Sequence, residues 1–350
     1  MSTAALLHAL PATPKTVHWG YFDASLEPVL TVRSGDLVRI EALTHHAGDA
    51  PDLLMDEGIE RVFAQVDDRG PGPHLLTGPI AVAGARPGDV LQVDILEARP
   101  RLAFGSNFAG HWGHLYEDFG KERVTIFELD IEAMLARARF AYDWAHAPGA
   151  TPPGTIVTPD PATREPALDG VVVGMRPHFG TMGVAPAQPG RHSSIPPGDH
   201  GGNIDNWRIG AGGRMLYPVQ VPGALLSVGD PHVSQGDGEV SGTALEASLN
   251  GLLRLTIRRD LDVRVPLLET AGELLVHGFG DDLDEAMRAA ARRTLDVLAR
   301  QYGLSRDDAY AFMSVAVDFT VTQVVDGHQG VHGRIDKRCF PRFAAGAAPG

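Results

Sequence analysis

The sequence has 350 residues, of which 43% are hydrophobic and 21% are charged, and its formal net charge at pH 7 is −14. A chain of this length and apolar content can bury one large core or two smaller ones. The acidic balance argues against nucleic acid or an anionic membrane surface as partner, because phosphate groups are bound by clustered Lys and Arg, and the 30 such residues here are scattered.

The chain has one cysteine, Cys339, which excludes an intrachain disulfide and is typical of a reducing compartment. Its first residues hold a short apolar run without the basic segment of a secretory signal peptide. No uninterrupted stretch of about 18 apolar residues is present, so the sequence predicts no membrane-spanning helix. We therefore expect a cytoplasmic protein.

Short runs rich in β-branched residues dominate the first three quarters of the chain, and Pro/Gly turns such as Arg86-Pro-Gly-Asp89 separate them. These runs predict strands at 29–32, 36–42, 80–83, 89–96, 123–129, 216–221, 225–228 and 252–258. Many short strands with regular turns favour a β-sandwich or barrel-like arrangement of sheets. The Pro- and Gly-rich segment 147–166 predicts a long surface loop.

The C-terminal quarter has a helical pattern. Asp282 and Glu285 form an acidic cap pair, and apolar residues at helical spacing follow them as far as Gly303. Ser305 and Asp308 begin a second predicted helix, which ends near residue 316 and is followed by a strand-like run.

We therefore expect a β-rich body with a C-terminal α+β layer. The body spans 15–265 and carries the site loops, and the α+β part spans 266–340 of the same catalytic unit. Residues 1–14 and 341–350 are expected to be flexible.

Two glycine-rich clusters, over 198–205 and 229–239, hold most of the candidate site residues. Glycine permits positive φ and a close approach of the backbone to a ligand. Carboxylates and imidazoles concentrated there are the ligands expected for zinc or another divalent cation, although a solvated acidic loop would explain either cluster alone. A short strand-turn-strand lies between the clusters, and we expect this hairpin to tie them together. The polar residues concerned are Asp199, His200, Asn203, Asp205, Asp230, His232, Asp237 and Glu239.

If the second cluster is extended, Asp230 and His232 point to one side, and Asp237 and Glu239 have the same relation. The spacing matches no single metal motif such as H-E-x-x-H. A divalent cation at this position would polarise a carbonyl group and activate water, and a carboxylate such as Glu239 could transfer the proton. The residues therefore suit metal-assisted hydrolysis of a small carbonyl compound.

Other reaction types fit the sequence less well than metal-assisted hydrolysis. The run Gly210–Met215 fails the dinucleotide fingerprint and precedes a strand. The serine amidases need a glycine-rich nucleophile segment that 192–195 lacks, and a nitrilase-type role for Cys339 is disfavoured by its place near the end of the sequence. Metal-assisted attack by water is the mechanism that remains.

Several long motifs resemble those of the acetamidase/formamidase family. They are Gly183-Val-Ala-Pro186, Pro197-Gly-Asp-His-Gly-Gly-Asn-Ile-Asp205, Val221-Pro-Gly-Ala224, Ser227-Val-Gly-Asp-Pro-His232 and Gln235-Gly-Asp-Gly-Glu-Val240. The resemblance covers about residues 15–340, and it departs from the family pattern at 333–336. It implies hydrolysis of short aliphatic amides to carboxylate and ammonia, a β-rich fold with a small α+β part, a metal site and a homo-oligomer, a dimer or higher. The family residues carried over are Asn203, Asp205, Asp230, His232, Asp237 and Glu239.

The leading hypothesis is an amidohydrolase of formamide, acetamide or a similar primary amide that uses zinc, with calcium as the alternative metal. Its catalytic residues are Glu239 and Asp237, its metal ligands are Asp205, His232, Asp230 and His200, and its substrate-binding residues are Asn203, His74 and His46. For His46, in the polar loop His45–Asp49, a solvated turn is the alternative.

Two further readings stay open. One is a non-catalytic metal- or sugar-binding β-sandwich protein, although a calcium module has little need of imidazole ligands. The other is a metal-dependent hydrolase of a larger amide, for which the aromatic segment 104–119 would provide room.

Overall fold

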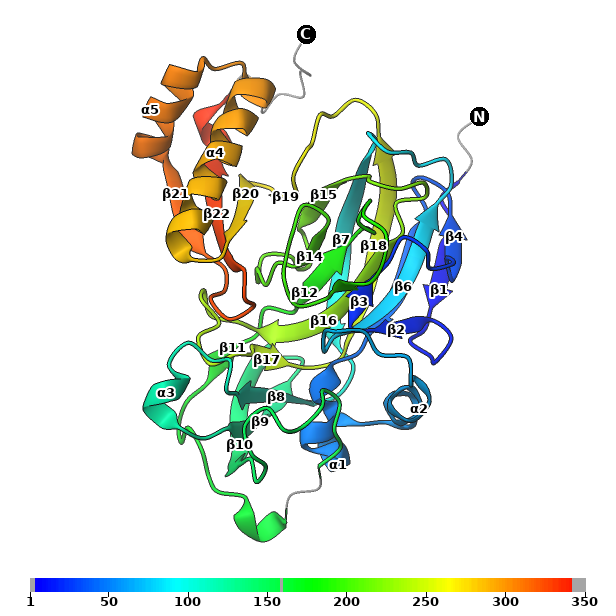
Figure 1. Ribbon diagram of the computed structural model, residues 1–350, viewed down its shortest axis with the longest axis vertical. Coiled ribbons are helices and arrows are strands. Elements are labelled where there is room, and N and C mark those ends of the chain that lie inside the picture. The colour runs from blue at the N-terminus through cyan, green and yellow to red at the C-terminus, as the bar shows by residue number, and fades with distance from the viewer. Residues whose placement is uncertain (1–3, 158–159, 342–350) are drawn as a thin grey trace.

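The computed structural model describes residues 4–157 and 160–341, and within these residues two large β-sheets form most of the molecule (Figure 1). The first sheet has the strand order β1 (Leu7–Leu10), β5 (Leu37–Ala42), β18 (Leu249–Arg258), β7 (Val90–Pro100), β15 (Arg214–Pro218), β19 (Leu267–Glu269), β20 (Glu273–Gly280), β22 (Gln329–Asp336) and β21 (Val317–Val321). All its neighbouring strands are antiparallel except β1 and β5, which are parallel.

The second sheet carries the candidate site. Its order is β11 (Val173–Gly174), β10 (Leu135–Asp143), β9 (Arg123–Asp130), β8 (Phe104–Ala109), β17 (Leu245–Glu246), β16 (Leu226–Ser234), β12 (His178–Gly183) and β14 (Gly201–Asn203). Strand β6 (Leu75–Val82) also pairs with β16 and with β2 (Val17–Trp19) and β4 (Leu30–Val32), while β3 (Tyr21–Phe22) pairs with β13 (His192–Ser193).

The main hydrophobic core lies between the two sheets. Ile40 and Leu253 from the first sheet pack in one cluster with Phe179, Met182 and Val228 from the second, and all five are buried. In β18 the buried and less buried residues alternate, as the alternating sequence of this strand predicts.

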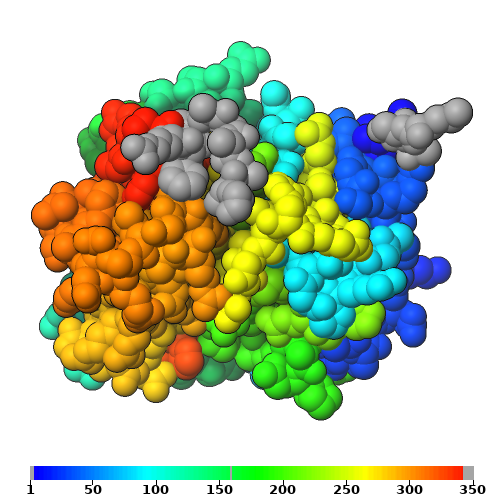
Figure 2. Space-filling model, turned by 90° about the horizontal axis from the view of Figure 1, so that it is seen from above, coloured from blue at the N-terminus to red at the C-terminus, as the bar shows by residue number. Residues whose placement is uncertain are grey.

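Helices α4 (Leu283–Tyr302) and α5 (Arg306–Ala316) cover the end of the first sheet formed by β20, β21 and β22 (Figure 1). Asp282 caps α4 by accepting a hydrogen bond from the Glu285 amide at 2.8 Å, and Gly303 ends the helix with a φ of 69°. Apolar residues of α4 pack against β20 and β22, and those of α5 pack against α4 and β21. Figure 2 shows these helices in orange on one side of the molecule and the N-terminal strands in blue on the other.

The remaining helical segments are short. They are α1 (Pro51–Leu54), α2 (Glu57–Gln65) and α3 (Tyr116–Phe119), together with 3₁₀ turns η1 (His45–Asp49), η2 (Pro161–Thr163) and η3 (Lys337–Cys339). None of the helices in the described part of the chain is long and apolar enough to cross a membrane.

The β-rich class and the C-terminal helices agree with the sequence-based expectation, but two details differ. The predicted hairpin between the glycine clusters is wrong: β15 lies in the first sheet and β16 in the second. Residues 7–10, expected to be flexible, form strand β1 beside β5. Residues 1–3 and 342–350, for which flexibility was also predicted, lie outside the described residues.

Candidate functional site

Strand β12 brings the two glycine clusters together. It pairs with β14 on one side and with β16 on the other, so Thr181 is the register partner of both Asn203 and Gly229. The two clusters therefore meet across β12.

The centre of the site lies directly over Gly180 in β12. A Cβ atom added there would lie 2.6 Å from Asp230 Oδ2 and 2.6 Å from His232 Cε1, and closer still to Asp205 Oδ1. The side chains of both glycine clusters thus converge on a position where only glycine leaves room for them.

Three of the acidic residues around this centre have an unusual backbone. Asp205, Asp230 and Glu239 have φ values of 49°, 48° and 49°, in the left-handed region that non-glycine residues seldom adopt. Such conformations cost free energy and are concentrated at functional sites. They turn these carboxyl groups inward, and all three residues are buried.

The buried carboxylates and imidazoles form overlapping groups of ligand atoms. His232 Nε2 lies 3.2 Å from Asp230 Oδ2 and 3.1 Å from Glu246 Oε1, and His74 Nε2 lies 3.7 Å from Asp230 Oδ2. In each of three groups, the ligand atoms lie within 4.8 Å of one another. These groups are His45, His74 and Asp230; Asp205, His232 and Glu239; and Asp230, His232 and Glu246.

The buried carboxyl groups fall into two sets, one with raised pKa values and one with a lowered pKa. Burial and the neighbouring Asp230 raise the pKa of Asp205 to about 7, and burial together with Asp205 raises the pKa of Glu239 and of Asp326 well above its usual range. Burial opposes ionisation of Asp230 too, but His74 and His232 hold its pKa far below the usual value. Burial likewise opposes protonation of His232, yet Glu246 and Asp230 hold its pKa well above 6.5.

Several polar atoms in this cluster have no hydrogen-bond partner among the described residues, although they are buried. They are Asp205 Oδ1, Glu246 Oε2, Asp326 Oδ2, His45 Nδ1 and His46 Nε2. Buried polar atoms normally have a partner. Unpaired oxygen and imidazole ligands, gathered around the space that Gly180 leaves, fit a divalent cation.

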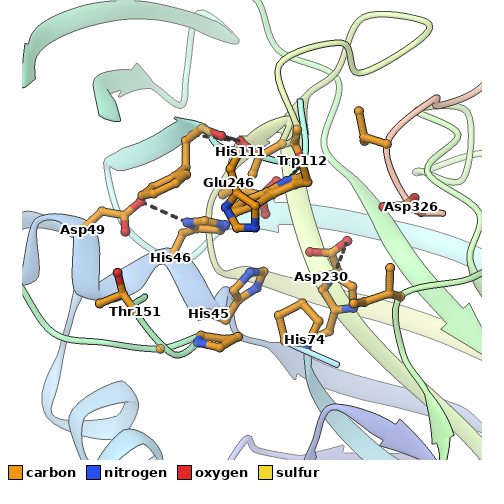
Figure 3. A pocket seen from close by; sticks show the side chains of 18 of the residues that line it. His45, His46, Asp49, His74, His111, Trp112, Thr151, Asp230, Glu246 and Asp326 are labelled. Atoms are coloured by element: carbon orange, nitrogen blue, oxygen red, sulfur yellow. Dashed lines mark hydrogen bonds and ion pairs between the residues drawn. The ribbon is translucent and has the colours of Figure 1, made fainter. Parts of the chain in front are cut away.

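Hydrogen bonds to neighbouring side chains fix the orientation of His46 and His74. His46 Nδ1 lies 3.0 Å from Asp49 Oδ2, which also accepts a hydrogen bond from Ser106 Oγ at 2.5 Å. His74 Nδ1 lies 2.9 Å from Ser194 Oγ. Figure 3 shows His45 between His46 and His74, with Asp230 next to His74. Imidazoles held in this way keep one ring nitrogen for a ligand.

A pocket with a volume of about 380 Å³ contains seven of the nine site residues that the sequence suggested. They are Asn203, Asp205, Asp230, His232, Glu239, His74 and His46. The pocket walls come from strands of the second sheet, from η1 and from loops that include the one after β10.

The structure does not bring the other two residues into this cluster. Asp237 is exposed and accepts hydrogen bonds from Trp207 Nε1 at 2.9 Å and from Arg208. It does not share a side with Glu239, because the turn at Glu239 breaks the extended conformation on which that expectation depended. His200 packs against Phe22, with 5.0 Å between ring centroids, and lines a separate cavity.

Sequence reasoning missed Glu246 and Asp326 of the carboxylate cluster, and it gave His45 too little weight. Glu246 and Asp326 belong to no glycine cluster, and His45 was assigned only to a polar loop. Asp326 precedes Gly327 directly after the strand-like run at 320–325, and an acid-glycine pair after a strand was the available signal. For Glu246, which pairs with His232 across β16 and β17, the sequence offers no comparable signal.

The fold and the pocket together define a class: a two-sheet β protein in which loops from distant parts of the chain surround a buried group of metal-type ligands. A sequence model of the Acetamidase/Formamidase family matches residues 11–194 and 190–332. The chain belongs to this family.

Known proteins resemble parts or all of this chain. An acetamidase of Mycolicibacterium smegmatis is 34% identical over 203 residues, which cover 48% of this chain and 49% of that protein. A formamidase of Methylophilus methylotrophus is 30% identical over 251 residues, 62% of this chain and 58% of that protein. The chain thus spans about half the length of the curated relatives it matches.

A solved structure of an acetamidase from Yersinia enterocolitica superposes with a TM-score of 0.77 at 24% identity. The superposition covers 97% of this chain and 94% of that one. At this level of identity the likeness establishes the shared fold.

Proposed function

We propose that the protein hydrolyses short aliphatic primary amides, such as formamide or acetamide, to a carboxylate and ammonia. The family of the chain, with relatives that are an acetamidase and a formamidase, supports this reaction. The observation that carries the proposal is the convergence of Asp205, Asp230 and His232 over Gly180, at one end of a pocket.

Asp205 and His232 are the proposed principal ligands of a divalent cation, with Asp230 and Glu246 completing the site. Mixed oxygen and imidazole ligands favour zinc over calcium, which prefers oxygen alone. When bound, such a cation supplies the Lewis acidity that polarises an amide carbonyl and activates water.

Glu239 is the proposed general base. Its buried carboxyl group has a raised pKa, because burial and the charge of Asp205 oppose its ionisation. A carboxylate with raised basicity accepts a proton from water more readily and can then deliver it to the departing nitrogen. Attack by water forms the new C–O bond, the C–N bond then breaks, and the protons of the water pass to the departing nitrogen, so amide and water give a carboxylate and ammonium.

Asn203 and His74 are proposed to position the amide. Asn203 Oδ1 accepts a hydrogen bond from Thr181 Oγ1, which fixes the orientation of the Asn203 side chain. Its NH₂ group is then suited to donate to the substrate carbonyl. His46, held by Asp49, is a further group that faces the pocket.

The test combines metal analysis of the purified protein with ammonia release from formamide and acetamide. Asp205→Ala and His232→Ala should each remove bound metal and activity together, whereas Asp237→Asn, in the same acidic region but exposed, should keep both. Full metal occupancy in Asp205→Ala and His232→Ala would contradict the ligand assignment. Bound metal in the unaltered protein without any ammonia release would favour the non-catalytic binding protein instead.

We also propose that the protein acts in the cytoplasm as a homo-oligomer and binds neither nucleic acid nor membranes. The single cysteine and the acidic net charge support this. The segment 266–340 is proposed to belong to the same catalytic unit as 15–265, which is supported by Asp326 lining the pocket.

A further inference from the structure

One end of the pocket is built from aromatic rings, beside the ion pair of His111 and Glu122. Phe108 from β8 stacks on Trp112 with ring centroids 5.4 Å apart and planes 2° from parallel. Phe108 also meets the edge of Trp144, with centroids 4.9 Å apart. All three rings line the pocket, and we call them the aromatic wall.

Hydrogen bonds fix the two indoles of the aromatic wall before any ligand arrives. Trp112 Nε1 donates to the carbonyl of Gly242 at 2.7 Å, and Trp144 Nε1 donates to Thr151 Oγ1 at 2.9 Å. Their polar atoms are therefore satisfied by the protein, and the ring surfaces that remain are apolar. A rigid aromatic surface binds a flat ligand at low cost in conformational entropy.

Glycines on both sides of Trp112 leave room for its indole. A Cβ atom at Gly110 would lie 2.6 Å from the Trp112 ring, and one at Gly242 would lie 2.5 Å from Trp112 Nε1. Trp112 remains 38% exposed although it is packed in this way. The chain thus holds a large apolar ring at the pocket without burying it completely.

A row of histidines connects the aromatic wall to the carboxylate cluster. The ring centroids of Phe108 and His46 are 5.7 Å apart, those of His46 and His45 are 4.2 Å apart, and those of His45 and His74 are 5.3 Å apart. His74 in turn contacts Asp230. Figure 3 shows this row along one side of the pocket. One ligand can therefore have a polar head at the carboxylates and an apolar body toward the rings.

The size of the pocket exceeds what a short amide needs. If each non-hydrogen atom is given the volume of a water molecule, about 30 Å³, acetamide fills about 120 Å³ and benzamide about 270 Å³. The pocket volume is about 380 Å³. Acetamide would leave most of the space beside the aromatic wall to water, whereas benzamide would displace that water from an apolar surface.

We propose that the aromatic wall binds a flat aromatic acyl group, so that the protein also accepts primary amides of aromatic carboxylic acids. This inference rests on the proposed amide hydrolysis for its chemistry, in which water and benzamide give benzoate and ammonium. The carboxamide lies at the carboxylate cluster, and the ring lies against Trp112 and Phe108.

The test measures kcat and KM for acetamide and benzamide, and the binding of benzamide by calorimetry. We expect benzamide to bind more tightly than acetamide. Trp112→Leu should lower kcat/KM for benzamide by about ten- to a hundredfold through a higher KM, as expected for the loss of aromatic contact and buried apolar area. The value for acetamide should change by less than about threefold, because that amide does not reach the wall.

Phe119→Leu is the matched control. Phe119 belongs to the same segment but is 71% exposed and does not line the pocket. In Phe119→Leu, kcat/KM should therefore stay unchanged for both acetamide and benzamide. Acetamide turnover without any binding or hydrolysis of benzamide would overturn the inference and leave the proposed function intact. If no amide is hydrolysed, the proposed function fails, and the calorimetric comparison of the unaltered protein with Trp112→Leu still decides whether the wall binds an aromatic amide.

Discussion

Replacing Gly180 by alanine adds one methyl group at the point where the carboxylate cluster converges. The φ of Gly180 is outside the left-handed region, so alanine meets no backbone obstacle there. Its Cβ would lie 2.6 Å from Asp230 Oδ2 and from His232 Cε1, whereas ordinary contacts begin at 3.4 Å. Both groups must therefore retreat by about 0.8 Å, and Asp205 must retreat further.

A displacement of this size is large for a catalytic group. Shifts of about 1 Å can lower rates by about a hundredfold, so we expect kcat/KM to fall at least by that factor and metal affinity to fall as well. Overpacking should cost about 1–3 kcal/mol of unfolding free energy, and each kcal/mol lowers Tm by about 2–4 °C in a large domain.

The assay compares ammonia release, metal content and thermal unfolding of Gly180→Ala with those of Gly174→Ala. Gly174 also lies in a strand of the second sheet, but an added Cβ there has no neighbour within 4 Å. This control should retain activity and metal. A Gly180→Ala protein with near-normal kcat/KM and metal content would refute the assignment of the reaction to this cluster.

Three other changes test separate parts of the structure. Glu239→Gln should lower kcat by about 10²–10⁴-fold with metal content preserved; near-normal turnover would move the general base elsewhere. In chelator-treated protein, the raised pKa of Asp205, about 7 against 3.8, means that the folded state holds a proton that the unfolded state has lost. Stability should therefore fall as pH rises from about 4 to about 7, and a Tm that rises between pH 5 and pH 7 would contradict this sign. Asp282→Ala removes the cap of α4 and should cost about 1 kcal/mol in denaturant unfolding without altering kcat/KM; a loss of activity would show coupling between α4 and the pocket.

Elements with a local cause were predicted well from the sequence. The helix predicted over 282–302 is observed as α4 at Leu283–Tyr302, because its cap, its apolar spacing and its terminal glycine all lie within the segment. The predicted run 36–42 is likewise strand β5, Leu37–Ala42. Strand pairing was not predictable in this way. Only residues 219–225 separate strands β15 and β16, yet their partners lie in different sheets, and long-range packing decides which partner each strand takes.

In the candidate site too, residues marked by a local sequence pattern were predicted, and residues brought in by strand pairing were not. Asp205, Asp230, His232 and Glu239 each lie within three residues of a glycine in the sequence, and all four line one pocket. The same sequence pattern also suggested Asp237. Sequence spacing cannot reveal that the φ of 49° at Glu239 turns the Glu239 carboxyl group inward while that of Asp237 stays in solvent. Glu246 enters the site only through its pairing with His232, a contact that exists only after the sheet has formed.

The pocket is lined by residues from His45 to Asp326, so no early portion of the chain contains it. A polypeptide emerging from the ribosome can pair β12, β14 and β16 long before residue 326 is synthesised, and it then carries an acidic, incomplete cluster. Contacts this distant in sequence form slowly, because the intervening chain must be ordered first. The carboxylate cluster is complete only after the segment between β21 and β22, which holds Asp326, has docked. Maturation of the site is therefore coupled to the completion of folding.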